Sequence, residues 1–101
     1  MLDFKSLTFS FGAHKGEAQH ETLRADFDSR INKVECAIQG FNVQYTNADH
    51  HLQSLLVAPH VAPPNNNSVD VTVDYLLRDN SGDIDDLYEG VVQVLVIVDR
   101  V

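Results

Sequence analysis

A histidine pair beside an aspartate is the first group in this chain whose residue types suit chemistry. Asp49, His50 and His51 follow one another directly after the short polar stretch 46–48. Imidazole and carboxylate groups can bind a divalent metal, or act as a general base and the group that orients it. Adjacent residues of a strand point to opposite faces, so only a turn would let these side chains converge. The alternative is a polar turn in which Asp49 and one histidine hydrogen-bond the local backbone. We take His50 and His51 as candidate ligand-binding residues.

An acidic segment, residues 79–86, is the second group. It holds four carboxylates within eight residues, those of Asp79, Asp83, Asp85 and Asp86. Calcium takes roughly six to eight oxygen ligands, and acidic loops can supply them. The segment is not an EF-hand loop, because Gly82 falls fourth and Gly90 stands where the final glutamate belongs. It is either a calcium loop of another kind, with the four aspartates as ligands, or a solvated hairpin turn in which Gly82 supplies a positive φ.

Three tyrosines are candidate recognition residues, because a flat apolar ring with a polar tip suits stacking on a sugar or lying at an interface. Tyr45 and Tyr75 are in phase with the apolar positions of their predicted strands, so we expect them in the core. Tyr88 directly follows the acidic segment, and we expect it to be exposed and to bind a ligand.

Nucleophilic catalysis has little support in the sequence. It contains no G-x-S-x-G elbow, no P-loop and no G-x-G-x-x-G motif. The single cysteine, Cys36, shares parity with Val34 and Ile38, which predicts a small buried apolar side chain and leaves no internal disulfide. We expect a protein that is not an enzyme and holds no cofactor, with calcium in the acidic segment as the alternative.

The charge balance argues against two classes of partner. The chain has 101 residues, with 15 Asp and Glu against 7 Lys and Arg and a net charge of −8. Nucleic-acid binding requires a basic surface, and an anionic membrane repels an acidic one. The longest apolar run, residues 94–98, is far shorter than the roughly 20 residues of a spanning helix, and no signal-peptide pattern is present. These features are consistent with the cytoplasm or with a virion component.

Alternation of apolar and polar residues predicts strands along most of the chain. It is clearest at Leu7, Phe9 and Phe11, at Leu23, Ala25 and Phe27, and at Val69, Val71, Val73 and Tyr75. Only residues 14–24 and 83–88 could carry a turn or two of helix. About six strands separated by polar turns indicate a single all-β domain over residues 1–101, an antiparallel β-sandwich or small barrel.

Two predicted strands have special features. The inward parity of residues 33–46 shifts at Gln39-Gly40, which indicates a β-bulge near Gly40 in one long bent strand, or a corner between two strands. Pro59 within residues 52–61 assigns that strand to a sheet edge or an irregular end.

The last predicted strand, residues 89–99, is apolar on both faces. Such a strand is either covered on both sides within the domain, or its outer face meets another subunit. Because so short a chain can cover few faces, we expect a homo-oligomer that associates through this strand.

The central strand also resembles a known family. Gly40-Phe41-x-Val43-x-Tyr45, in a short chain of six predicted strands, resembles the G-F-x-V strand of H-type lectin domains. The resemblance implies a six-stranded antiparallel sandwich that forms trimers and binds carbohydrate near subunit boundaries. The family usually carries a tryptophan in its last strand and this chain has none, so no ligand-binding residue is carried over. Our expectation is therefore a non-enzymatic binding or assembly module, with carbohydrate binding as the alternative and calcium binding as a further one.

Overall fold

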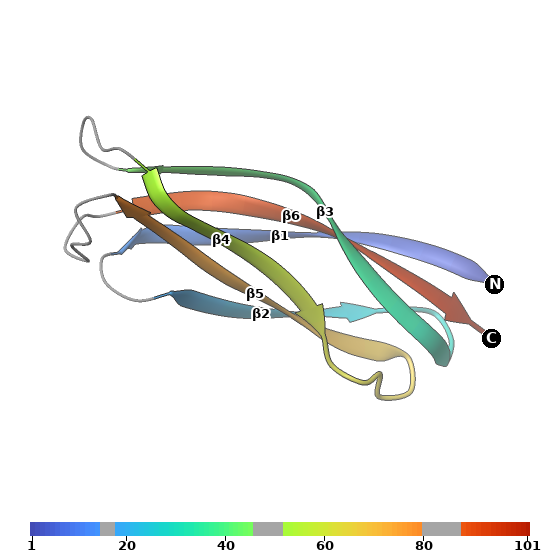
Figure 1. The fold of residues 1–101 in the computed structure, drawn as a ribbon. Coiled ribbons are helices and arrows are strands. Elements are labelled where there is room, and N and C mark those ends of the chain that lie inside the picture. The colour runs from blue at the N-terminus through green and yellow to red at the C-terminus, as the bar shows by residue number, and fades with distance from the viewer. Residues whose placement is uncertain (15–17, 46–51, 80–87) are drawn as a thin grey trace.

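Six strands in two sheets make up the fold (Figure 1). The computed structural model describes residues 1–14, 18–45, 52–79 and 88–101. Its strands are β1 (Leu2–His14), β2 (Gln19–Asp26), β3 (Ile31–Tyr45), β4 (Leu52–Val61), β5 (Ser68–Asp79) and β6 (Tyr88–Arg100). They form two three-stranded antiparallel sheets, ordered β1-β6-β3 and β2-β5-β4. This arrangement confirms the predicted all-β antiparallel sandwich.

The described residues contain no helix, and none of them forms a helix long and apolar enough to cross a membrane. The helical turn considered for residues 14–24 is therefore wrong over the range that belongs to β2. That segment is polar enough to be ambiguous by itself. It is extended because it pairs along its whole length with β5, from Gln19 opposite Tyr75 to Asp26 opposite Ser68.

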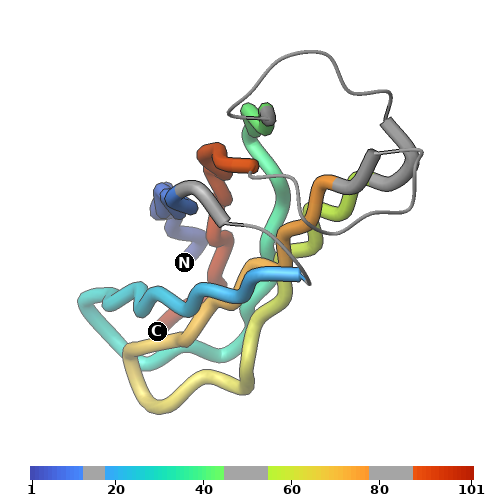
Figure 2. The backbone as a smooth tube through the Cα atoms, turned by 90° about the vertical axis from the view of Figure 1, so that its left-hand side faces the viewer, coloured from blue at the N-terminus to red at the C-terminus, as the bar shows by residue number. Residues whose placement is uncertain are grey.

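The two sheets pack face to face, and their inward-pointing residues form the core. Figure 2 shows the two layers from one end of the molecule. The central strands contribute most, with alternate residues of β5 and β6 fully or almost fully buried: Val69, Val71, Val73 and Tyr75, and Val92, Val94, Val96 and Val98. The alternation read from the sequence therefore describes the core correctly on both central strands.

The long strands make the molecule elongated. Its extents are 50 × 18 × 18 Å and its radius of gyration is 15.7 Å, above the roughly 13 Å of a compact domain of this length. Three strands are too few to curl a sheet around a core. The two outer sheet faces therefore form a large share of the surface, and what they carry matters for function.

The bulge predicted near Gly40 is confirmed. The pairing of β3 with β6 shifts register between Ile38 and Gly40, so that Ile38 lies opposite Val94 and Gly40 opposite Gln93. The extra residue restores the inward parity for Phe41 and Val43. In Figure 1 β3 bends along its length. The edge position predicted from Pro59 is also confirmed, since β4 lies at the edge of its sheet.

The asparagine-rich segment after β4 joins the two sheets at one end. Asn66 has a φ of 56°, a left-handed conformation that asparagine tolerates. Its carbonyl oxygen accepts a hydrogen bond from the Ile31 backbone N–H, and that of Asn67 accepts one from the Phe27 N–H, both 2.8 Å. The Asn67 side chain donates to the Phe27 carbonyl oxygen, also at 2.8 Å. This segment therefore fixes the turn between β2 and β3.

An aromatic cluster connects the sheets toward the other end. The ring of Phe11 stacks on that of Tyr75, with centroids 4.3 Å apart, and Tyr88 lies 5.6 Å from Tyr75. The Tyr75 hydroxyl occupies the space that a side chain on Gly90 would need, because a Cβ there would overlap both this hydroxyl and the Asn42 carbonyl oxygen. Gly90 is thus required by packing across the sandwich.

We expect Gly90→Ala to lower the free energy of unfolding by about 3 kcal/mol, because neither the Asn42 backbone nor the stacked Tyr75 ring can move away without disturbing the core. Gly40→Ala is the matched control, since a Cβ at Gly40 meets nothing within 4 Å. Its stability should be unchanged or raised by up to about 1 kcal/mol. Urea unfolding followed by circular dichroism measures both, and equal effects of the two substitutions would contradict this account.

Candidate functional site

Of the residues predicted from the sequence to bind a ligand or a metal, Tyr88 is the one whose side chain the structure describes. His50, His51, Asp83, Asp85 and Asp86 lie outside the described residues, and so does the turn at residues 80–83. Asp79 ends β5, where its backbone lies opposite Leu52. The histidine pair and the acidic segment therefore remain predictions. Within the described residues, no group of three or more His, Cys, Asp or Glu is arranged to hold a metal ion.

The exposure expected of Tyr88 is wrong, because its side chain is 0% exposed. Tyr88 begins β6 and has the same parity as Val92 and Val94, so it points into the core. Its hydroxyl donates a hydrogen bond to the Tyr75 carbonyl oxygen at 3.3 Å. Burial raises the pKa of Tyr88 and, more strongly, that of Tyr75. Tyr88 has no free ring face for a sugar and serves as a core residue.

Two other expectations concern inward-pointing residues. Tyr75 is fully buried, as predicted. Cys36 points inward opposite Val96 and packs against the core, but is only half-buried because β3 lies at a sheet edge. The same burial raises the pKa of the Cys36 thiol. The side chain of Tyr45, at the end of β3, is not among those described.

The outer face of the β2-β5-β4 sheet is polar, and its polar groups pair with one another. The His20 Nδ1 lies 2.6 Å from an Asp74 carboxylate oxygen, whose second oxygen lies 3.5 Å from the His60 Nε2. The Thr22 and Thr72 hydroxyls are 2.8 Å apart, and the Arg24 guanidinium lies 3.2 Å from the Asp70 carboxylate. Apart from Leu56 and Leu76 near one end, this face has the character of a solvated surface.

The outer face of the β1-β6-β3 sheet is different, because apolar side chains lie side by side across all three strands. The pairing register places Phe4 beside Ile97 and places Leu95 beside Ala37. Phe4 is 53% exposed and Leu2, at the end of the same row on β1, is 67% exposed. We call this group the apolar patch: Leu2, Phe4, Ala37, Leu95 and Ile97.

Sequence reasoning missed the β1 part of this patch, although a signal was present. Leu7, Phe9 and Phe11 occupy odd positions and point into the core, whereas Leu2 and Phe4 occupy even ones. An apolar residue out of phase with its own strand faces outward. Extending the predicted strand back to Leu2 would have placed Phe4 on the outer face.

The same outer face is hollowed farther along the strands, beyond the hydrogen bond that the Ser6 hydroxyl donates to the Gln39 side-chain oxygen at 2.7 Å. Two depressions of about 300 and 230 Å³ adjoin there and share Asn42 and Val91. We call them together the amide-lined hollow, since their walls include the side chains of Asn42, Gln44, Glu89 and Gln93.

Glycines leave the hollow open, and its amides are available. Gly12 and Gly40 line it, and a Cβ at either would meet nothing within 4 Å. The Gln44 amide donates to the Glu89 carboxylate at 3.5 Å. Within the described part of the chain, the Asn42 and Gln93 side chains make no hydrogen bond. No Lys or Arg is among the residues that line the hollow.

Comparison with protein-family models, with curated proteins and with solved structures found no match to this chain. Among the described residues, the features that bear on function are two parts of the β1-β6-β3 outer face, the apolar patch and the amide-lined hollow.

The two buried tyrosine hydroxyls should respond differently to removal. Within the described residues the Tyr75 hydroxyl has no hydrogen-bond partner, so Tyr75→Phe should leave the free energy of unfolding unchanged or raise it by about 1 kcal/mol. Tyr88→Phe removes the bond to the Tyr75 carbonyl oxygen and should lower it by about 1 kcal/mol or more. Urea unfolding of the pair at equal protein concentration provides the comparison. Destabilisation by Tyr75→Phe would mean that this hydroxyl has a partner after all.

Proposed function

We propose that this chain is a small, non-enzymatic assembly module that associates with copies of itself through the outer face of its β1-β6-β3 sheet. The observation that carries this proposal is the contrast between the two outer faces. One is polar with its groups paired across strands, whereas the other exposes Phe4, Leu2 and their apolar neighbours. A contiguous exposed apolar patch of this kind marks an interaction surface.

The central strand β6 strengthens this argument. Its inward residues are covered by the other sheet and form the core. Its outward residues Leu95 and Ile97 are also apolar, although they are not part of that core. A solvated antiparallel sheet normally has polar residues at such positions. A second protein surface over the patch would account for both residues.

Light scattering coupled to size-exclusion chromatography at micromolar concentration tests this proposal. The expected mass is a multiple of the 11.3 kDa of one chain. Phe4→Ser combined with Ile97→Thr should weaken association by roughly 30-fold or more, corresponding to about 2 kcal/mol, because exposed anchors at the centre of an interface contribute most. A wild-type monomer under these conditions would contradict the proposal.

The matched control for those variants is Leu56→Ser. Leu56 is 38% exposed on the outer face of the β2-β5-β4 sheet. Its replacement therefore removes a similar apolar side chain from a surface that is not the proposed interface. The oligomer should survive this change. Thermal unfolding of all variants shows whether loss of association reflects the interface or the fold.

A second candidate function, carbohydrate binding, is favoured by the amide-lined hollow. Side-chain amides both donate and accept hydrogen bonds, as sugar hydroxyls do. Val91, which is 38% exposed, lines both depressions and offers an apolar surface beside the amides. Because Glu89 lies in the wall and no Lys or Arg lines the hollow, a neutral sugar suits it better than an anionic one.

Titration with a panel of neutral and acidic monosaccharides tests the second candidate, with the side-chain amide NMR signals of Asn42 and Gln93 as the readout. Neutral sugars should shift these signals and acidic ones should not. Gly40→Leu should abolish the shifts by filling the open space over Gly40, whereas the smaller Gly40→Ala should retain them. Silence across the whole panel, or unchanged binding by Gly40→Leu, would remove this candidate.

A further inference from the structure

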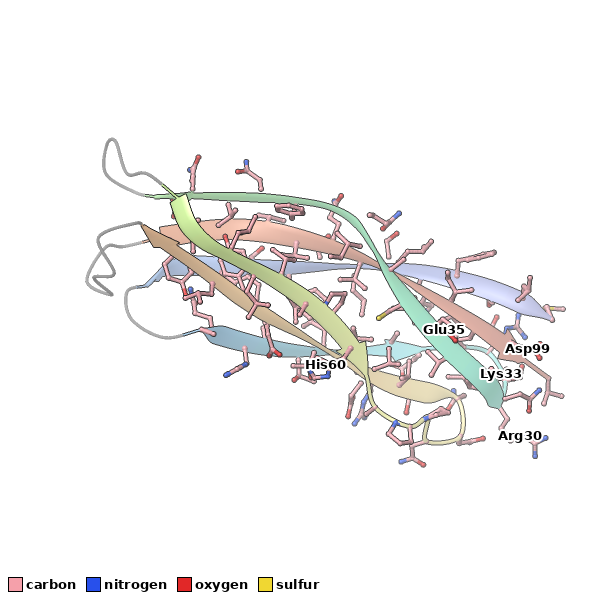
Figure 3. All side chains as sticks on the ribbon, viewed as in Figure 1. Arg30, Lys33, Glu35, His60 and Asp99 are labelled. Carbon is pink, nitrogen blue, oxygen red and sulfur yellow. The ribbon has the colours of Figure 1, made fainter. Side chains whose placement is uncertain are left out.

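Two opposite charges border the apolar patch on the edge strand β3. Lys33 and Glu35 are both exposed and stand two residues apart, so they lie on the same outer face. The register places Lys33 beside Asp99 and Glu35 beside Ile97. Figure 3 shows Lys33, Glu35 and Asp99 together at one end of the molecule.

The other charges nearby already have partners. The N-terminal ammonium lies 3.0 Å from the Asp99 carboxylate, and the Arg100 guanidinium donates to the Asp3 carboxylate at 2.8 Å. Lys33 and Glu35, by contrast, form no ion pair with any described residue. They are therefore available to a molecule that covers the patch.

A positive and a negative side chain with this spacing are complementary to the same two side chains of a second molecule that runs in the opposite direction. In a two-fold interface the same surface is contributed by both subunits, so that each contact occurs twice. When β3 lies antiparallel over β3 of a second copy, with the axis between residues 33 and 35, each lysine meets the partner's glutamate. The pairing register then places Phe4 against the partner's Leu2 and Ile97 against the partner's Asp99.

We propose that the occupant of the apolar patch is a second copy in this two-fold arrangement, with Lys33 of each copy paired to Glu35 of the other. The inference rests on the proposed assembly function and adds the symmetry of the contact. A ring would instead bring the patch against a different surface. On the polar face of the other sheet, His20 and His60 are paired with Asp74 and Arg24 with Asp70, so among the described residues that face offers no free cation for Glu35.

Charge reversal tests the pairing, with the dimer dissociation constant measured at 0.15 M salt. Lys33→Glu places four carboxylates together and Glu35→Lys places four ammonium groups together, so each single variant should dimerise at least about tenfold more weakly than the wild type. The double variant Lys33→Glu/Glu35→Lys restores both pairs and should return to within about threefold of the wild type. An equimolar mixture of the two single variants should form the heterodimer, in which opposite charges meet again.

Arg24→Glu and Asp26→Lys are the matched controls, because they change the net charge equally from exposed positions on β2. They should dimerise like the wild type. In 1 M salt the deficit of the single variants should shrink, since the contact is solvent-exposed. Circular dichroism should show that all variants are folded.

The outcomes separate the two proposals. If the wild type is a monomer, the assembly function fails. If the wild type associates but the double variant is no better than the single variants, or the mixture forms no heterodimer, the two-fold arrangement is wrong while assembly stands. A wild-type trimer would overturn the two-fold arrangement directly.

Discussion

The structure depends on one constraint, which is that two three-stranded sheets can bury only one face of each strand. The core between the sheets takes the inward residues of β5 and β6, which are almost completely buried. Every outward residue must then be satisfied by water or by another molecule. In a molecule of 50 × 18 × 18 Å these outward residues form much of the surface. The character of the two outer faces is therefore the strongest functional information that the fold contains.

The two outer faces satisfy this constraint in different ways. On the β2-β5-β4 sheet, cross-strand pairs such as Arg24 with Asp70 and Thr22 with Thr72 make a surface that is stable in water. On the β1-β6-β3 sheet, Phe4 and Ile97 lie side by side, and their apolar side chains form no hydrogen bonds with water. Their burial against a second copy would be favourable in the same way as burial in the core.

The glycines of this sheet have two distinct roles. Gly90 faces inward and is required, because the Tyr75 hydroxyl occupies the space of its missing side chain. Gly40 faces outward beside Gln93 and is required by no neighbour. The missing side chain at Gly40 keeps the hollow open on this sheet face. Gly40 also lies at the bulge that bends β3, so the bulge and the hollow share this residue.

The alternation of apolar residues was sufficient to predict the all-β class and the bulge near Gly40, because both depend on side-chain parity. The edge position of β4 followed from Pro59, which has no backbone N–H to donate to a neighbouring strand. Both are local properties of the chain. The alternation also held the information that Tyr88 and Phe4 face opposite sides of their sheet, although the first was expected to be exposed and the second was not considered. What only the tertiary structure decided is the order β1-β6-β3 and β2-β5-β4. That order depends on contacts between residues far apart in the chain, such as Phe4 with Ile97 and Ile97 with Glu35. Parity assigns a side chain to a face, but only the pairing of strands gives it neighbours, and a patch or a hollow is made of neighbours.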